Sequence, residues 1–164
     1  MHRNTEIVVA AAERLGLHIE PLTYPDGTRT AEDAARAIGV DVAQIVKSLV
    51  FDLVPADGEV RPVIALVSGA NRLDEAKLAT VGGAERVGRV DADRVRAVTG
   101  FPIGGVPPFG HPTPIPTFVD PDLLDHAEVW AAGGTPQVVF GIAPAALVVA
   151  TEGDVRDLAV SARP

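Results

Sequence analysis

Apolar and polar residues follow two periods along the chain, and together they predict helices interleaved with short strands. Apolar residues three and four positions apart indicate helices, whereas alternation indicates strands with one buried face. The predicted helices cover residues 5–15, 31–38, 42–46, 74–80, 92–98 and 144–149. The predicted strands cover residues 18–24, 48–54, 60–67, 116–119, 129–132, 137–142 and 155–159.

Polar residues at the predicted helix starts support these boundaries. Thr30, Asp41 and Asp91 can each accept a hydrogen bond from a free N–H of the first helical turn. Residues 55–58 (Pro-Ala-Asp-Gly) form a turn between two of the predicted strands, which indicates a hairpin. Because hairpins occur among the helices, we expect a mixed sheet rather than a purely parallel one.

Length and composition indicate one domain over residues 1–164, which is large enough to bury a hydrophobic core without disulfides or a structural metal ion. The net charge of −8 argues against a protein that coats nucleic acid through a broad basic surface. The chain has no cysteine, which excludes disulfide scaffolds, thiolate zinc sites and a cysteine nucleophile.

Hydropathy predicts no membrane association. The longest apolar run, residues 141–150, is too short to span a bilayer and contains Pro144. The first residues lack the apolar stretch and cleavage site of a signal peptide. We therefore expect a cytoplasmic protein.

Common catalytic motifs are absent from the sequence. It contains no G-x-S-x-G, H-E-x-x-H, Walker or G-x-G-x-x-G pattern. The histidines, His2, His18, His111 and His126, lack the spacing of metal ligands. The sequence therefore predicts no bound metal and no cofactor.

One of the two lysines lies among apolar residues. Lys47 and Lys77 are the only lysines, and Lys47 lies inside an apolar run that enters a predicted strand. A lysine there either extends its ammonium to solvent at a sheet edge or binds an anion in a cleft. Lys77 falls on a polar helix face, which is typical of a solvated side chain.

A loop over residues 100–112 contains four glycines and four prolines. Proline stiffens a loop, and glycine lets a ligand approach the backbone closely. The exposed N–H groups of such a loop could bind a carbonyl oxygen or an oxyanion. An ordinary rigid connection between a helix and a strand would have the same composition.

Four segments, taken in order, resemble motifs of the YbaK/EbsC family, which includes free-standing relatives of the prolyl-tRNA synthetase editing domain. They are TAEDAA (30–35), QIVKSLVF (44–51), NRLD (71–74) and TGFPIGGVPPFG (99–110). The resemblance extends over about residues 18–160. It implies a mixed α/β fold with a central, partly barrel-like sheet flanked by helices.

The resemblance also implies a function, which is hydrolysis in trans of the ester between a wrong amino acid and the 3′-terminal adenosine of a tRNA, often tRNA-Pro. The family works without a metal or a covalent intermediate. Lys47 matches the lysine thought to hold the terminal phosphate region of the tRNA. Gly104 and Gly105 belong to the loop whose amides contact the aminoacyl group and position water. The substrate-binding positions that we expect are Tyr24, Thr30, Ser48, Pro108, His111 and Ala132.

Two departures from the cysteinyl-tRNA branch of the family bear on specificity. Pro107 and Ala132 stand where that branch often has serine. Both make the expected pocket less polar, which argues against a cysteinyl specificity and leaves small amino acids such as alanine open. His111 either touches the substrate or lies in solvent.

The expected partner is the acceptor end of a mischarged tRNA, and a prolyl-tRNA synthetase is a candidate second partner. Arg36, Arg72 and Lys77 are the candidate tRNA contacts. We expect binding to neither DNA nor membranes. The alternative is a non-catalytic module that binds a nucleotide or the tRNA acceptor end and works with a synthetase.

Overall fold

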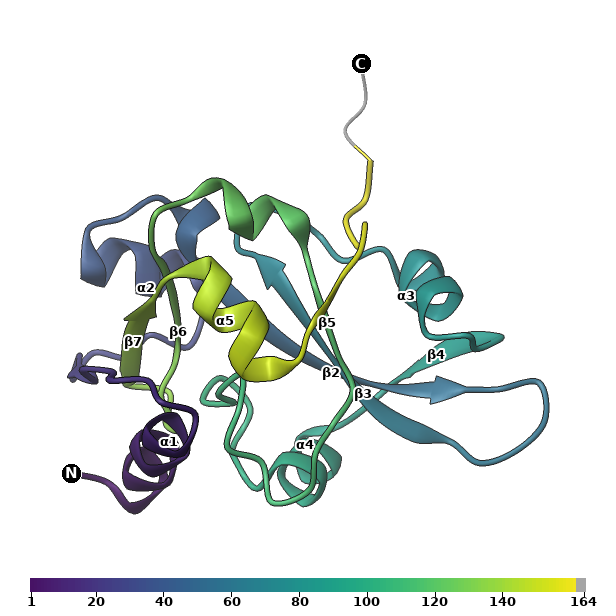
Figure 1. Cartoon of the computed structure of the whole chain (residues 1–164), viewed down its shortest axis with the longest axis horizontal. Helices are drawn as coiled ribbons and strands as arrows, with labels where there is room; N and C mark the ends of the chain where they lie inside the picture. Colours follow the sequence, from purple (N-terminus) through teal and green to yellow (C-terminus); the bar gives the residue numbers. More distant parts are fainter. Residues whose placement is uncertain (162–164) are drawn as a thin grey trace.

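The computed structural model describes residues 1–161 and contains five α-helices and two β-sheets (Figure 1). The helices are α1 (Arg3–Arg14), α2 (Ala31–Ile38), α3 (Glu75–Val81), α4 (Ala92–Thr99) and α5 (Pro144–Thr151), with 3₁₀ turns η1 (Val42–Gln44) and η2 (Pro121–Asp125). The strands are β1 (Leu22–Thr23), β2 (Val46–Val54), β3 (Arg61–Ser68), β4 (Arg86–Arg89), β5 (Thr117–Val119), β6 (Val129–Ala132), β7 (Val138–Ile142) and β8 (Asp154–Val155).

The larger sheet is mixed, as predicted. Its strand order is β4-β2-β3-β5-β8, with β2 antiparallel to β3 and β4, and β5 parallel to β3 and β8. The smaller sheet, β1-β7-β6, is antiparallel. The larger sheet remains open, with β4 and β8 at its edges, and does not close into a barrel. The expected mixed α/β class is therefore confirmed.

Several element boundaries differ from the prediction. The strand expected over residues 18–24 is reduced to β1, because only Leu22 and Thr23 pair with β7. The helix expected over 42–46 is only the turn η1, and Val46 already begins β2. The last strand, expected over 155–159, is β8 instead. The pattern also missed the short elements β4 and η2.

The cap residues of α2 act as predicted and fix its ends. Thr30 Oγ1 accepts a hydrogen bond of 3.0 Å from the N–H of Asp33. Gly39 ends the helix with a left-handed φ of +86°, a conformation that glycine adopts without the strain of a Cβ. These caps fix the first and last residues of α2.

Both faces of β3 are buried, which divides the core into two layers. Ile64 and Leu66 face the layer that contains α1 and the loop over 101–112, whereas Val63, Ala65 and Val67 face the layer that contains α3. Phe101, Val106 and Phe109 belong to the first layer, so the proline-rich loop is itself part of the core. Burying each of these side chains is worth about 1.5–3 kcal/mol, which fixes the loop in place.

Within the described residues, the open stretch of β2, residues 46–50, pairs with β3 on one side and with no other strand of the larger sheet. The edge strand β4 pairs only with residues 51–54 of β2. The N–H of Gly69 donates to the carbonyl of Ile45, and the N–H of Glu85 donates to the carbonyl of Val54, on opposite sides of β2. Backbone groups alternate in direction along an antiparallel strand, so Ser48 presents its N–H and C=O away from β3, toward the open stretch.

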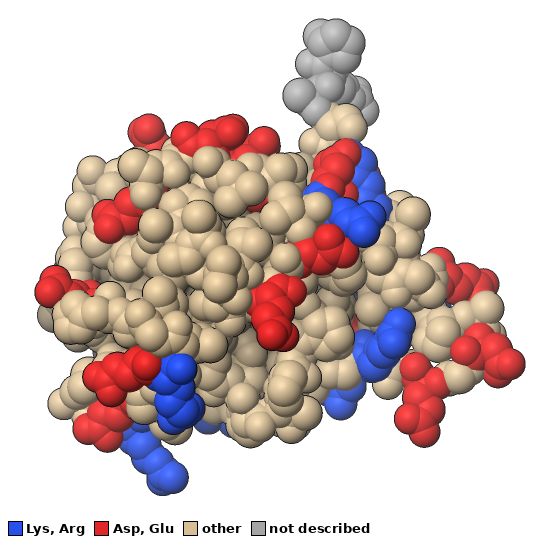
Figure 2. All heavy atoms as spheres, viewed as in Figure 1, with Lys and Arg blue, Asp and Glu red and all other residues tan. Residues whose placement is uncertain are grey.

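Within residues 1–161, every helix is too short or too polar to cross a membrane. Most of the face drawn in Figure 2 is neither acidic nor basic, and the acidic side chains form separate patches on it, with fewer Lys and Arg side chains.

Candidate functional site

A cavity of about 510 Å³ lies along the open stretch of β2. Its walls come from β2, the beginning of α2, strand β6 and the loop over residues 103–106. Five of the residues that the sequence predicted for the site line this cavity: Thr30, Lys47, Ser48, Gly104 and Ala132. These residues are up to about a hundred positions apart in the chain, and the fold brings them together.

Lys47 is partly buried at the rim of the cavity and does not extend freely into solvent. Its Nζ donates a hydrogen bond to the carbonyl oxygen of Asn71. Burial lowers the pKa of Lys47, and the nearby carboxylates of Glu32 and Asp120 counteract this shift. The ammonium group is therefore a positive charge only partly exposed to water, as an anion-binding group requires.

Asp120 organises the backbone that holds Lys47. This carboxylate is 1% exposed and accepts hydrogen bonds from Ser68 N–H (3.1 Å) and Asn71 Nδ2 (2.8 Å). The Asn71 side chain also donates to Asp122 at 2.7 Å. These contacts fix Asn71, so that its carbonyl oxygen is correctly placed for the Lys47 ammonium.

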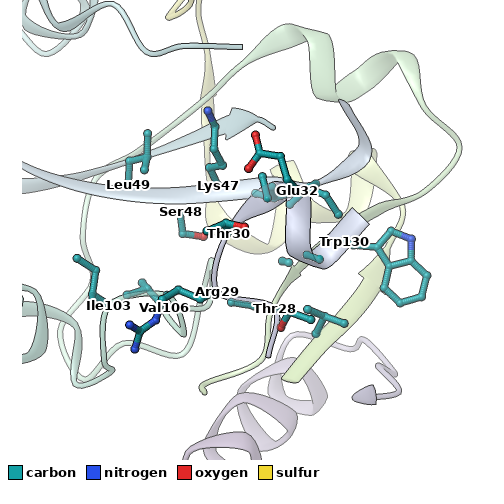
Figure 3. Close-up of a pocket in the computed structure, with 18 residues that line it drawn as sticks. Thr28, Arg29, Thr30, Glu32, Lys47, Ser48, Leu49, Ile103, Val106 and Trp130 are labelled. Carbon is teal, nitrogen blue, oxygen red and sulfur yellow. The ribbon is translucent and has the colours of Figure 1, made fainter. Parts of the chain in front are cut away.

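Ser48 projects from the opposite face of β2, toward Thr30 (Figure 3). Its Oγ is buried and makes no hydrogen bond with any of residues 1–161. Thr30 Oγ1 already accepts a hydrogen bond from Asp33. A buried hydroxyl without a partner is costly, so the Ser48 hydroxyl, beside the cavity, is a candidate for a contact with a ligand.

The glycine loop lines the cavity with Ile103, Gly104 and Val106. Gly104 has φ +83°, and a Cβ there would stand 2.9 Å from Cγ of Arg29. Gly105 donates its N–H to Pro102 O at 2.9 Å, so its amide is used within the loop. No hydrogen bond among the described residues uses the N–H of Gly104 or Val106. These two amides are thus the better candidates for ligand donors.

Three expected substrate-binding residues lie outside this cavity. His111 and Pro108 line a separate hollow beside α1. His111 Nε2 lies 2.8 Å from Pro107 O, and its ring stands edge-on to Phe101 at 6.4 Å between centroids. Burial lowers the pKa of His111 more than the hydrogen bond with Pro107 O raises it. Tyr24 bonds Gln137 O through its backbone N–H, away from the cavity. His111 thus holds the loop and lies neither in open solvent nor against Lys47.

The expected tRNA contacts are spread over three places. Arg72 lines a second hollow of about 450 Å³ that shares Lys47 and the glycine loop with the cavity. Arg36 forms an exposed ion pair of 3.2 Å with Asp33. Lys77 donates to Asp157 at 2.8 Å and to Ala159 O at 2.7 Å, so its ammonium is occupied at the end of the described chain.

Glu32 and Arg29 also line the cavity, although the sequence reasoning gave neither a role in the site. Glu32 lies in the first turn of α2, where a carboxylate interacts favourably with the helix dipole. Two features of the sequence could have pointed to Glu32. It lies two residues after the predicted cap Thr30, and its helix precedes Lys47, the lysine inside an apolar run. Residues 1–161 contain no group of three or more His, Asp or Glu side chains placed to hold a metal ion.

Comparison with known proteins places this site in a family. Residues 25–149 match the family described as "Aminoacyl-tRNA editing domain". The chain is 26% identical to EbsC of Enterococcus faecalis, whose name marks it as a proposed deacylase of Cys-tRNA(Pro) and Cys-tRNA(Cys), over 79% of this chain and 76% of EbsC. It is 36% identical to the proline–tRNA ligase of Nitratidesulfovibrio vulgaris over 65% of this chain but only 18% of the ligase.

A solved structure agrees with this relationship. It is described as a proposed trans-editing enzyme for prolyl-tRNA synthetase, and it superposes with a TM-score of 0.88 at 44% identity. The superposition covers 98% of this chain and 99% of the other. The family match includes the beginning of α2, the strand β2 with Lys47, and the glycine loop, which are elements that line the cavity. The chain therefore belongs to the aminoacyl-tRNA editing domain family.

Proposed function

We propose that this protein is a deacylase that acts in trans on mischarged tRNA, hydrolysing the ester between a wrong amino acid and the 3′-terminal adenosine. The observation that carries the proposal is the cavity itself. Among residues 1–161, it brings a partly buried cation, Lys47, together with the hydroxyl of Ser48 and the amides of Gly104 and Val106, which make no hydrogen bond. Family membership supports the same reaction class.

In the proposed mechanism, the chain positions the substrate and does not attack it. Lys47 binds the phosphate next to the terminal ribose by a charge-assisted contact. The amides of the glycine loop bind the ester carbonyl oxygen and stabilise the negative charge that develops there. Water attacks the carbonyl carbon, the bond to the ribose oxygen breaks, and that oxygen leaves with a proton as a hydroxyl. A neighbouring ribose hydroxyl assists the attack by orienting the water.

The proposed amino acid is small, with alanine on tRNA-Pro as the leading candidate. Five of the side chains that α2 and the smaller sheet contribute to the cavity are short or branched apolar ones: Ala31, Ala34, Ala131, Ala132 and Val139. These apolar side chains offer a cysteine thiol no polar partner. The names of relatives that refer to prolyl-tRNA synthetase support the choice of tRNA.

The proposed partner is the tRNA acceptor end, with a prolyl-tRNA synthetase as a second candidate. We place the protein in the cytoplasm, because mischarged tRNA arises there, and treat residues 1–164 as one editing domain. The candidate tRNA contacts that remain closest to the cavity are Lys47 and Arg72. Arg36 and Lys77 would have to give up their present carboxylate partners.

A panel of mischarged tRNAs tests the function. The release of labelled amino acid under single-turnover conditions is measured for tRNA-Pro carrying alanine, cysteine, serine or proline. We expect release of alanine and protection of correctly paired proline. If the protein slows spontaneous hydrolysis of every ester, it is a binding module and the proposal is wrong.

A further inference from the structure

We propose that Glu32 binds the α-ammonium group of the aminoacyl ester and so restricts the site to esters with a free amino group. This inference rests on the proposed function, since it concerns the ligand of the same cavity. It gives a specificity role to a residue for which the sequence predicted no place in the site.

Glu32 occupies a position from which it can reach a ligand in the cavity. It lies in the first turn of α2, is exposed, and lines the same cavity as Lys47. Figure 3 shows its carboxylate and the Lys47 ammonium on the same side of β2. Ser48 and Arg29 reach toward the other side (Figure 3).

The two opposite charges do not neutralise each other. Among residues 1–161, neither Glu32 nor Lys47 takes part in an ion pair within 4.0 Å. Lys47 instead donates to the neutral carbonyl of Asn71. The carboxylate is nonetheless near enough to raise the pKa of Lys47 against the effect of burial. Each charge therefore remains available to a ligand.

A cation and an anion side by side match a ligand that carries both charges. The aminoacylated end of a tRNA does so, with an ammonium next to the ester carbonyl and a phosphate across the ribose. If Lys47 binds the phosphate, Glu32 is the carboxylate on the same rim that can accept hydrogen bonds from the ammonium. A free carboxylate beside a bound phosphate would otherwise repel the substrate.

The competing explanation is that Glu32 serves only the helix, because acids in a first turn interact favourably with its dipole. Asp33 provides the matched control. It lies in the same turn, but its carboxylate pairs with Arg36 and it does not line the cavity. Loss of a helix-stabilising charge should affect Glu32→Gln and Asp33→Asn alike, whereas loss of ligand recognition should affect only Glu32→Gln.

The test compares two ligands that differ in one group. Alanyl and lactyl forms have the same size, but lactyl has a hydroxyl in place of the ammonium. Binding is measured with non-hydrolysable amide-linked alanyl- and lactyl-adenosine 5′-phosphate at about pH 6.5, where the amino group is protonated. Hydrolysis of alanyl- and lactyl-tRNA-Pro is measured in parallel on the same variants.

We expect the unmodified protein and Asp33→Asn to prefer the alanyl ligand by ~10-fold or more, as for a charge-assisted hydrogen bond. Glu32→Gln should weaken alanyl binding and reduce this preference to about threefold or less. Lactyl binding should stay the same or become stronger, because the repulsion between the Glu32 carboxylate and the phosphate is removed. An unchanged preference in Glu32→Gln, or an equal loss for both ligands, would overturn the assignment. If the binding preference behaves as expected but no ester is hydrolysed, ammonium recognition is supported and the proposed deacylase activity fails.

Discussion

Gly105 lies so close to the backbone of Thr135 that a Cβ on Gly105 would stand 2.8 Å from the Thr135 Cα. The turn that contains Thr135 is itself attached to α1. Thr5 Oγ1 donates to Gly133 O at 2.9 Å, and Asn4 Nδ2 donates to Gly134 O at 3.0 Å. The loop beside the cavity is therefore positioned by a helix at the other end of the sequence.

Replacing Gly105 with alanine should reduce both stability and activity. Because the added methyl meets backbone rather than a flexible side chain, the loop or the turn must move, at a cost of about 1–3 kcal/mol. Thermal melting and single-turnover deacylation measure the two effects. Gly88→Ala is the control, since its Cβ would meet only side-chain atoms at 3.7 Å or more. A variant Gly105→Ala with unchanged melting and rate would contradict this packing.

Ser48→Ala should lower activity without destabilising the protein. The Ser48 Oγ is buried and, within the described chain, makes no hydrogen bond, so its removal leaves no partner unsatisfied. We expect an unchanged or slightly higher melting temperature, together with a roughly threefold to tenfold lower kcat/KM if the hydroxyl bonds the substrate.

Ser68→Ala separates this effect from the general loss of a serine. Ser68 Oγ donates to Ala43 O at 2.7 Å, and its loss should cost about 1 kcal/mol of stability. Destabilisation of Ser48→Ala to the same degree would indicate that its hydroxyl has a structural role.

Lys47→Ala should remove most of the deacylase activity and leave the fold intact. The lost contact is charge-assisted, so about 2–4 kcal/mol of transition-state binding should disappear from kcat/KM. Lys47→Arg should recover only part of it, because a planar guanidinium does not replace a compact ammonium. Circular dichroism checks the fold. Near-normal rates in a folded Lys47→Ala variant would remove this lysine from the mechanism.

Titration of His111 should make stability fall in mild acid. Burial lowers the pKa of His111 below the ordinary value of 6.5 that it has in the unfolded chain. As the pH falls below about 6.5, the unfolded chain takes up the proton first, so the free energy of unfolding decreases. It recovers as the pH rises again. Urea unfolding between about pH 5 and pH 7.5 measures this slope.

His111→Gln should flatten that slope, because an amide can still donate to Pro107 O but does not titrate. His18→Gln is the matched control, since the His18 side chain is 83% exposed. An identical slope in His111→Gln and the unmodified protein would assign the pH dependence to other groups.

The sequence predicts the elements of this protein better than it predicts their contacts. Helix α2 and strand β6 have the predicted bounds, because caps and alternation are local signals. The strand predicted over residues 18–24 was largely wrong, because pairing depends on where β7 lies. β4 was not predicted for a related reason. Its four residues form a strand because they pair with β2, which is far away in the sequence, and a local pattern does not show such a pairing.

In the candidate site, too, the sequence indicates single residues and segments but not the contacts between them. The lone lysine inside an apolar run was visible in the sequence, and the glycine loop was visible in its composition. Composition could not show that Gly105 faces Thr135 or that His111 faces Pro107. Those facts depend on how the buried side chains of the loop enter the core.

Affinity for tRNA should depend only weakly on salt. The net charge is −8, and two of the expected contacts, Arg36 and Lys77, already pair with carboxylates. With about two phosphates neutralised, chiefly by Lys47 and Arg72, the slope of log K against log salt should be about −2. Titrating an amide-linked aminoacyl-tRNA analogue at several salt concentrations gives the slope. A value steeper than about −5 would require a basic surface much larger than these residues supply.

The open stretch of β2 has a consequence for the behaviour of the protein in solution. An unpaired strand edge can join the edge of a second molecule, which is a common route to aggregation. Here the beginning of α2 and the glycine loop stand beside that edge, so the walls of the cavity also shield it. Variants that displace the loop should therefore aggregate on storage as well as lose activity, and a ligand that fills the cavity should keep such variants monomeric.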